Sequence, residues 1–445
     1  MKISKNYNFI FISFFALYMI LPSYFAIELS AKLPLITASR ILLILLIGYY
    51  VIKNNFKIHT KIFEKKSIKK YFYIYFLCMI VTNLYYAFFV TDALKELFTI
   101  IVEELIVIWI ISQVIDSRNK LNDVLKIISI SSGIVAIIAV AGSITGYNLF
   151  YSLNTVSRQM LMSDYYRLGF IRASAGFGHA VYYGLYCIIM IVIAMFLIEN
   201  EKKNGLYKII FVLNLIGLFF SNSRGTMLVF IFLCLYMFGK KKYSDTKKYI
   251  SIIVVGMMMV LIVFTTSNKI QTFFDNVIGS IMNVFFPESV VLSDYGGNSQ
   301  SGIESRLNQF SMVKYAISQN PFFGLGAGAH MRNVQMWYNT MTHKWQMTDT
   351  YDVGYFAIIC MYGSIGLIGN IFLYIGLIKN IYSKELKKDK IIQMFKYVFV
   401  GYMASLFSVT GLDSVLWLMI GLFISYLNIL ENDNMQKKSN TIERN

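Results

Sequence analysis

The stretch LYKIIFVLNLIGLFFSNSRGTMLVFIFLCLYMF, residues 206–238, places a single arginine, Arg224, between two apolar runs. As one helix, these 33 residues would be about 50 Å long, whereas the hydrocarbon core of a bilayer is about 30 Å thick. Lysines lie at both ends, in 199–208 and 239–248, and lysine-rich connections favour the cytoplasmic side of a membrane. We therefore expect both ends on that side and a turn at SNSRG. Arg224 is then predicted at the opposite membrane surface or just beneath it.

The composition indicates a membrane protein. Of the 445 residues, 57% are hydrophobic and only 15% are charged, whereas soluble domains have about 45–50% apolar and about 25% charged residues. We expect an all-α, polytopic integral membrane bundle that forms one domain over residues 1–445. The four cysteines form no CxxC pair, so neither a disulfide framework nor a zinc site is indicated.

Twelve apolar stretches are long enough to suggest membrane spans. They lie near 9–27, 35–52, 71–90, 94–115, 124–145, 175–198, 206–220, 225–238, 249–266, 351–378, 397–410 and 415–430. Alternate connections, together with the two termini, hold 29 of the 41 lysines and arginines. The positive-inside rule places these segments, and so both termini, in the cytoplasm. The net charge of +17 is thus explained by topology, and no nucleic-acid partner is expected.

The other connections form two long extracytoplasmic loops, 146–174 and 267–350, the second between the ninth and tenth spans. Seven of the twelve remaining basic residues are arginine, and the planar guanidinium group binds two phosphate or carboxylate oxygens at once. The second loop contains an amphipathic helix near 304–319, with Arg306 in its first turn. Its apolar face is predicted from helical spacing to contain Leu307, Phe310, Val313 and Ile317.

Three arginines are candidate anion ligands. Arg224 either binds an anion at the membrane surface or extends toward lipid headgroups. Arg306 either has the same role or is a solvated helix residue. Arg172, in RASAGFGHAVYYG before the sixth span, is the third candidate.

Acidic residues and histidines of the same loops are candidates for acid–base roles. Asp349 and Asp352, in DTYDVGYF, would accept a proton or orient a hydroxyl group, or else cap the following helix. His330 follows a glycine-rich stretch, FFGLGAGAH, which is either a phosphate-binding loop or a simple turn. His330 and His343 are possible general bases.

Charged residues also fall inside predicted spans. Glu103 and Glu104 lie in the middle of the fourth span, and Arg40 lies in the second. Such residues are expected to pair or to relay protons; both interpretations stay open. The outer loops contain no DxD or DxE pair, and the chain has no nucleotide-binding glycine loop. We therefore predict no metal site and no cofactor.

Four stretches in the same order carry a family resemblance. They are RASAGFGHAVYYG, SNSRGTMLVFIF, ESRLNQFSMVKYAISQNPFFGLGAG and DTYDVGYFAIICMYGSIGLIG, scattered over about 165–370. Together they resemble the superfamily of O-antigen ligases and O-antigen or capsule repeat-unit polymerases, which are glycosyltransferases of the bacterial cytoplasmic (inner) membrane. The resemblance implies a GT-C-like bundle of about twelve helices and metal-independent transfer of glycans from polyprenyl (undecaprenyl) diphosphate. It also implies that Arg224 and Arg306 hold the diphosphate; Arg172 is our further candidate for this role.

The resemblance leaves three activities open. Ligases of the superfamily carry a His-Asn pair where this chain has Asp352-Val353, which favours a polymerase of O-antigen, capsular or exopolysaccharide repeat units. A ligase of finished glycan is the alternative, and a flippase of lipid-linked oligosaccharide is a third. The expected partners are the lipid-linked donor and acceptor and the membrane lipids, with a chain-length regulator and a flippase as further candidates.

Overall fold

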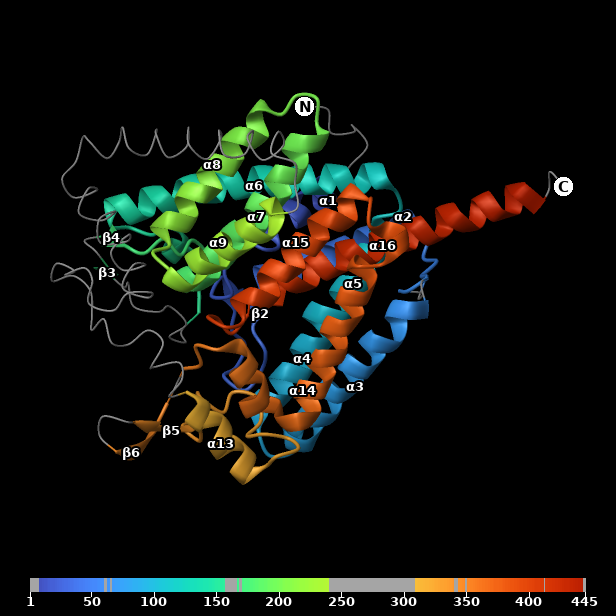
Figure 1. Cartoon of the computed structure of the whole chain (residues 1–445). Helices are drawn as coiled ribbons and strands as arrows, with labels where there is room; N and C mark the ends of the chain where they lie inside the picture. Colours follow the sequence, from blue (N-terminus) through green and yellow to red (C-terminus); the bar gives the residue numbers. More distant parts are fainter. Residues whose placement is uncertain are drawn as a thin grey trace.

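The computed structural model describes residues 8–59, 62–64, 66–156, 166–167, 170–239, 309–339, 343–348, 350–411 and 413–442. This part of the chain is mostly helical, with three two-stranded antiparallel sheets (Figure 1). The helices are α1 (Phe9–Leu17), α2 (Ala38–Lys53), α3 (Lys66–Ala87), α4 (Thr91–Thr99), a π-helical segment (Ile100–Ile106), α5 (Val107–Val114), α6 (Arg118–Thr145), α7 (Ala180–Asn200), α8 (Gly205–Phe220), α9 (Arg224–Phe238), α13 (Phe310–Gln319), α14 (Gly354–Ile381), α15 (Lys390–Ser405) and α16 (Asp413–Ile442). The strands are β1 (Ala26–Ile27) with β2 (Ile36–Thr37), β3 (Tyr166–Arg167) with β4 (Phe170–Ile171), and β5 (Met336–Asn339) with β6 (Lys344–Met347).

Five helical segments are long and apolar enough to cross a membrane. They are Thr91–Val114, Arg118–Thr145, Ala180–Asn200, Gly354–Ile381 and Ser414–Met435. An all-α membrane protein is therefore supported, whereas the predicted count of about twelve spans is not confirmed. The ninth predicted span, 249–266, lies outside the described residues.

The first predicted span, 9–27, is only partly helical. Helix α1 ends at Leu17, and turns lead into the strand β1. Pro22 lies in this turn region; proline lacks a backbone N–H and disfavours helical geometry in the residue before it. A nine-residue helix is about 14 Å long, too short for a hydrocarbon core of about 30 Å.

Helix α7 lies at the centre of the bundle. Of its most apolar stretch, 83% of residues are buried within the protein, and α16 follows with 78%. In Figure 1, α7 lies among α6, α8, α9 and α15. Trp417 and three phenylalanines, Phe395, Phe399 and Phe423, are fully buried where α15 and α16 contribute to the same core. Because the protein itself covers this apolar surface, lipid is not needed to bury the central helices.

The helix ends form two groups. The first group is connected by hydrogen bonds and consists of residues 143–148, 171–182, 220–226, 352–355 and 405–411. We call these five segments together the arginine rim. At the opposite helix ends, Lys126 pairs with Glu201 at 2.9 Å, Lys390 donates to Asn200, and Arg118 lies 3.4 Å from Asp433. The helix ends that the sequence assigns to one side of a membrane thus lie together.

Helix α14 is interrupted at Gly363, whose φ of 62° and ψ of −159° are not helical. The segment 321–326 passes this interruption and hydrogen-bonds with the helix on both sides of it. The amides of Leu325 and Gly326 donate to the carbonyls of Cys360 and Met361 at 2.8 and 3.0 Å. The amides of Ser364 and Ile365 donate in turn to the carbonyls of Pro321 and Phe322 at 2.9 and 3.2 Å. Backbone groups released by the interruption are thereby paired, as burial in a membrane protein requires.

Helix α13 covers the described part of the stretch near 304–319 in which an amphipathic helix is predicted, and only part of the predicted apolar face is buried. Met312, Val313 and Ala316 are buried, whereas Phe310 and Ile317 are 49% and 46% exposed. Apolar residues occur all around this short helix, so spacing alone allows two faces. Leu307 and Arg306 lie outside the described residues.

Candidate functional site

The turn between α8 and α9 is a buried polar segment. Its three residues Ser221, Asn222 and Ser223 and the following Thr226 are each at most 3% exposed. Asn222 adopts a φ of 48°, a left-handed conformation that asparagine tolerates better than most residues. The hydroxyl groups of Ser221 and Thr226 donate to the carbonyls of Leu218 and Ser223. The chain therefore reverses at the position where the sequence predicts a turn, and α9 begins at Arg224.

Arg224 is half-buried at the first position of α9. Its Nε is buried and has no hydrogen-bond partner among the described residues. No carboxylate of these residues lies within 4 Å of its guanidinium group. A buried donor without a partner costs about 1–3 kcal/mol, and more when it is charged. The unpaired amides at the start of α9 add partial positive charge. This position is thus suited to an anion.

Arg172 lies at the same turn. Its Nε donates to the carbonyl of Ser221 at 3.0 Å, and the neighbouring amide of Ala173 donates to the carbonyl of Phe220 at 2.9 Å. The structure therefore brings Arg172 beside the turn that carries Arg224, although 49 residues separate Arg172 from Ser221.

The segment after Arg172 is held by the end of α6 and the residues that follow it. The hydroxyl of Ser143 donates to the carbonyl of Ile171, and the side-chain amide of Asn148 donates to Ser174 and to the carbonyl of Ala175 at 3.1 and 3.0 Å. These contacts fix the backbone on both sides of Arg172.

His179 is a residue of this rim that the sequence did not single out. Its Nδ1 accepts a hydrogen bond from the amide of Val181 at 3.1 Å, so the side chain caps the start of α7. Burial, together with the positive charge of Arg172, lowers the pKa of His179 to about 4. The ring therefore stays neutral near pH 7. The signal was its position directly before an apolar helix, where a capping side chain is common.

Asp352 does not cap α14, because the N-cap residue is Val353 and no side chain bonds there. Instead, the Nε2 of Gln309 donates to the Oδ2 of Asp352 at 2.6 Å. The amide of Asp352 donates back to the Oε1 of Gln309 at 3.1 Å. Gln309 is buried and Asp352 is exposed. The carboxylate is thus held in one orientation and open to solvent.

The connection between α15 and α16 is hydrogen-bonded both to the rim segment 352–355, which contains Asp352, and to the start of α7. The amide of Gly354 donates to the carbonyl of Leu406 at 2.8 Å, and the hydroxyl groups of Tyr182 and Thr410 are 2.6 Å apart. No hydrogen bond or ion pair joins Arg224 directly to Asp352 within the described ranges.

The other loop candidates are less closely connected to this rim. Arg306 and Asp349 lie outside the described residues. The ring of His330 packs edge-on against Tyr351 at 5.1 Å, and His343 is exposed with a φ of 52°. In the glycine-rich stretch 322–330, the amides of Leu325 and Gly326 already bond to α14, so these two donors are not available to a phosphate.

The charged residues inside the bundle form their own network. The Nε of Arg40 donates to Glu103 at 2.7 Å, and its other nitrogens donate to the carbonyl of Leu35 and to Thr99. The hydroxyl of Tyr75 donates to Glu104 at 3.1 Å. Glu103 and Glu104 lie in the π-helical segment Ile100–Ile106. Arg40 and Glu103 therefore form an ion pair, and the network gives α2, α3 and the π-helical segment fixed relative positions.

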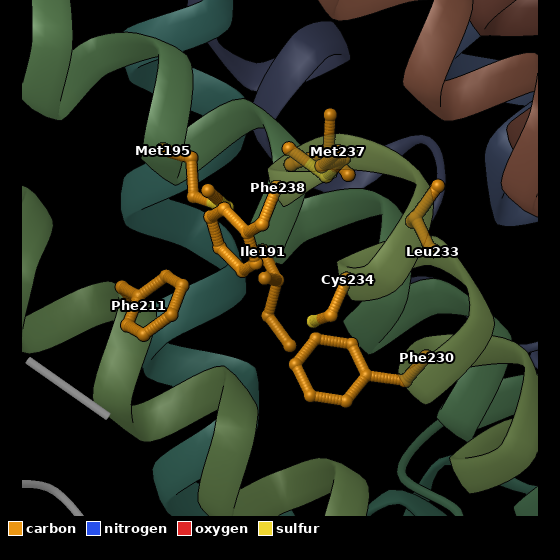
Figure 2. A pocket seen from close by; sticks show the side chains of 9 residues that line it. Ile191, Met195, Phe211, Phe230, Leu233, Cys234, Met237 and Phe238 are labelled. Carbon is orange, nitrogen blue, oxygen red and sulfur yellow. The ribbon is translucent and has the colours of Figure 1, made fainter. Parts of the chain in front are cut away.

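An apolar pocket lies among α7, α8 and α9 (Figure 2). Side chains of Ile191, Met195, Phe211 and Phe230 converge on it and leave a cavity of about 10 Å³, roughly the space that one water molecule needs. A second apolar hollow adjoins it on the surface of α9, with Ile231 and Leu235 in its wall. No group of three or more metal-ligating side chains occurs in the described part of the chain.

Comparison with known proteins identifies one domain. No curated protein matches the chain. Residues 209–371, which include Arg224, the glycine-rich stretch and Asp352, match the family model of O-Antigen ligase. The chain therefore contains an O-antigen-ligase-type domain over residues 209–371, which is consistent with the superfamily of O-antigen ligases and polymerases and implies a glycosyl-transferring enzyme in general.

Proposed function

We propose that this protein polymerises oligosaccharide repeat units linked to polyprenyl diphosphate, at the outer face of the bacterial cytoplasmic membrane. The observation that carries the proposal is the guanidinium group of Arg224. It is half-buried at a helix start, and its buried Nε has no partner among the described residues. A diphosphate group would supply the missing acceptor.

In this proposal, an acceptor hydroxyl attacks the anomeric carbon of the donor sugar. The new C–O bond forms as the bond between that carbon and the diphosphate oxygen breaks, and the diphosphate leaves with the bonding electrons. Arg224, with Arg172 and Arg306, stabilises the negative charge on the leaving oxygen; one such donor contributes about 3–4 kcal/mol. Asp352, oriented by Gln309, accepts the hydroxyl proton or directs the hydroxyl group.

The apolar surface of α9 supports a lipid-linked substrate. Arg224, Ile231, Leu235 and Phe238 follow one another at intervals of seven, four and three residues, so they lie on one face of the helix. The apolar hollow on this face and the pocket of Figure 2 begin about 9 Å along the axis from Arg224. We propose that the polyprenyl chain lies along this face, with its diphosphate at Arg224.

Cys234 offers a test of this lipid position, because it lines both the pocket and the adjoining hollow. Cys234→Trp should raise the KM for a substrate with a full-length polyprenyl chain and leave the KM for a short-chain analogue unchanged. Leu77→Trp, at a 63% exposed position of a helix outside this pocket, is the control. An equal effect on both substrates would contradict the proposed lipid position.

Asp352 favours a polymerase over a ligase, because ligases of the superfamily carry histidine and asparagine where this chain has Asp352 and Val353. The ligase remains the second candidate, because the matching family model is described as O-Antigen ligase. A ligase would move finished glycan to another acceptor.

A deletion strain separates these activities. Loss of the polymerase should leave surface glycan of a single repeat unit, and the wild-type gene should restore the ladder of longer chains. Long chains that accumulate on the lipid carrier would instead indicate a ligase. Absence of lipid-linked units from the outer face would indicate a flippase, and either result would contradict the polymerase.

A further inference from the structure

Three aromatic side chains gather where the β5–β6 hairpin meets α13. Trp345 of β6 lies 5.6 Å from the ring of Tyr338, its partner across the sheet, and 5.9 Å from the ring of Tyr315 on α13. Trp345 is 46% exposed, and both tyrosines are half-buried. We call Tyr315, Tyr338 and Trp345 the aromatic platform. In Figure 1 the hairpin and α13 lie together at one end of the molecule, beside the start of α14.

Hydrogen bonds hold the platform in place. Its hairpin is held to α13 by a 2.8 Å hydrogen bond from the amide of Tyr338 to the hydroxyl of Ser311. The side chains of Asn339 and Gln346 are hydrogen-bonded across the two strands at 3.0 Å. A surface that is ordered before binding loses little conformational entropy when a ligand arrives.

The platform is also amphipathic. The indole N–H of Trp345 has no hydrogen-bond partner among the described residues, so the ring offers an apolar face and a free donor together. Tryptophan and tyrosine combine a large apolar area with a polar group and lose little entropy on binding. A sugar ring has matching chemistry, with C–H groups on its faces and hydroxyl groups around its edge.

Helix α13 connects the platform with Asp352. Gln309, directly before the helix, orients the Asp352 carboxylate, and Tyr315 follows six residues later. The two positions are about 9 Å apart along the helix axis. A glycan whose reactive end is at Asp352 would reach Trp345 by extending about 9 Å along the axis of α13 and part of the way around it.

We propose that the aromatic platform binds sugar rings of the glycan next to the reacting unit. This inference rests on the proposed function, because it assumes that a glycan reacts at Asp352. The occupant is a saccharide chain, because the exposed indole face and the N–H of Trp345 match the C–H faces and hydroxyl groups of a sugar ring, and the exposed Lys344 beside it can donate to hydroxyl oxygens. The platform would retain the chain between successive additions.

The test uses the full-length protein in nanodiscs and, as probe, polysaccharide of the host strain released from its carrier by mild acid. Affinity is measured by calorimetry for wild type, Trp345→Ala, Trp345→Phe and Trp345→Leu. We expect Phe to bind within about threefold of wild type, and Ala and Leu to bind at least about tenfold more weakly, which corresponds to loss of one stacking contact. Met347→Ala is the matched control, because Met347 is 65% exposed on the same strand and face.

The same variants are then compared for chain length in the deletion strain and for melting temperature. Shorter glycan chains from Trp345→Ala, with normal chains from Trp345→Phe and Met347→Ala and unchanged melting temperatures, would support the platform. Binding by Trp345→Leu equal to that of Trp345→Phe would show that apolar bulk suffices, as at a membrane interface, and would overturn it.

Failure of the platform and failure of the proposed function give different results. If wild type elongates glycan and Trp345→Ala keeps both affinity and chain length, only the platform is overturned. If wild type neither binds nor elongates glycan, the proposed function itself is wrong.

Discussion

Replacement of Gly363 by alanine tests the interruption of α14. Its φ of 62° with ψ of −159° lies in a region that is open almost only to glycine, and other residues there cost about 1–3 kcal/mol. A Cβ at this position would also lie 2.4 Å from the carbonyl oxygen of Phe322 and 2.5 Å from the amide nitrogen of Gly324. Both atoms belong to backbone, so rotation of a side chain cannot relieve the clash.

The backbone must therefore move, and four hydrogen bonds between 321–326 and α14 are at risk. Each contributes about 1 kcal/mol. Loss of two to four of them, added to the strain, lowers the free energy of unfolding by about 3–7 kcal/mol. This is a large fraction of the about 5–15 kcal/mol of a typical protein.

The measurement is unfolding of the purified protein in detergent, with proteolysis near 320–330 as a local probe. Gly48→Ala is the control, because Gly48 lies inside α2 with no atom within 4 Å of an added Cβ, and alanine there should be neutral or stabilising by about 0.5–1 kcal/mol. Equal stability of Gly363→Ala and Gly48→Ala would refute the described geometry.

Three further predictions concern charged groups. Arg172→Ala should shorten or abolish glycan chains, and Arg172→Lys should restore them only in part, because lysine lacks the planar guanidinium group that binds two oxygens at once. Chains of normal length from Arg172→Ala would show that this residue does not belong to the site. Arg40→Ala should lower the free energy of unfolding by at most about 3–5 kcal/mol, because it leaves the half-buried Glu103 without its partner. Arg40→Leu/Glu103→Leu should recover most of this loss, and no recovery in the double variant would contradict the pair. The pKa of His179 is about 4 in the folded state and about 6.5 in the unfolded state, so the unfolded state binds more protons between these pH values. The free energy of unfolding should therefore fall by about 3 kcal/mol as the pH drops from 6.5 to 4. His179→Asn should flatten this pH dependence in melting curves, and an unchanged slope would contradict the assignment.

Features that depend on local sequence were predictable. The turn at SNSRG follows from the length of the apolar stretch 206–238 and from the lysines at its ends. The starts of α9 and α14 near Arg224 and Asp352 follow from the same patterns. The sequence also placed the opposite charges of Arg40 and Glu103 inside two predicted membrane spans, where charged residues are expected to pair.

Features that depend on tertiary contacts were not predictable. The stretch MYGSIG around Gly363 reads as a continuous helix, and its interruption exists because a segment about 40 residues away supplies hydrogen bonds. The contact of Arg172 with the turn at Ser221 requires α6, α7 and α8 to be packed first. Phe310 and Val313 were predicted on one apolar face, yet only Val313 is buried, because spacing cannot select between two apolar faces.

The central claim is that Arg224 holds a diphosphate during glycan elongation, and elongation by purified protein tests it most directly. Wild type, Arg224→Lys and Arg224→Ala are supplied with lipid-linked repeat units, and the products are separated on a gel. The account predicts that Arg224→Ala slows elongation by about 10²–10³-fold, that Arg224→Lys is intermediate, and that all three proteins unfold at similar temperatures. Elongation by Arg224→Ala at the wild-type rate would contradict the claim.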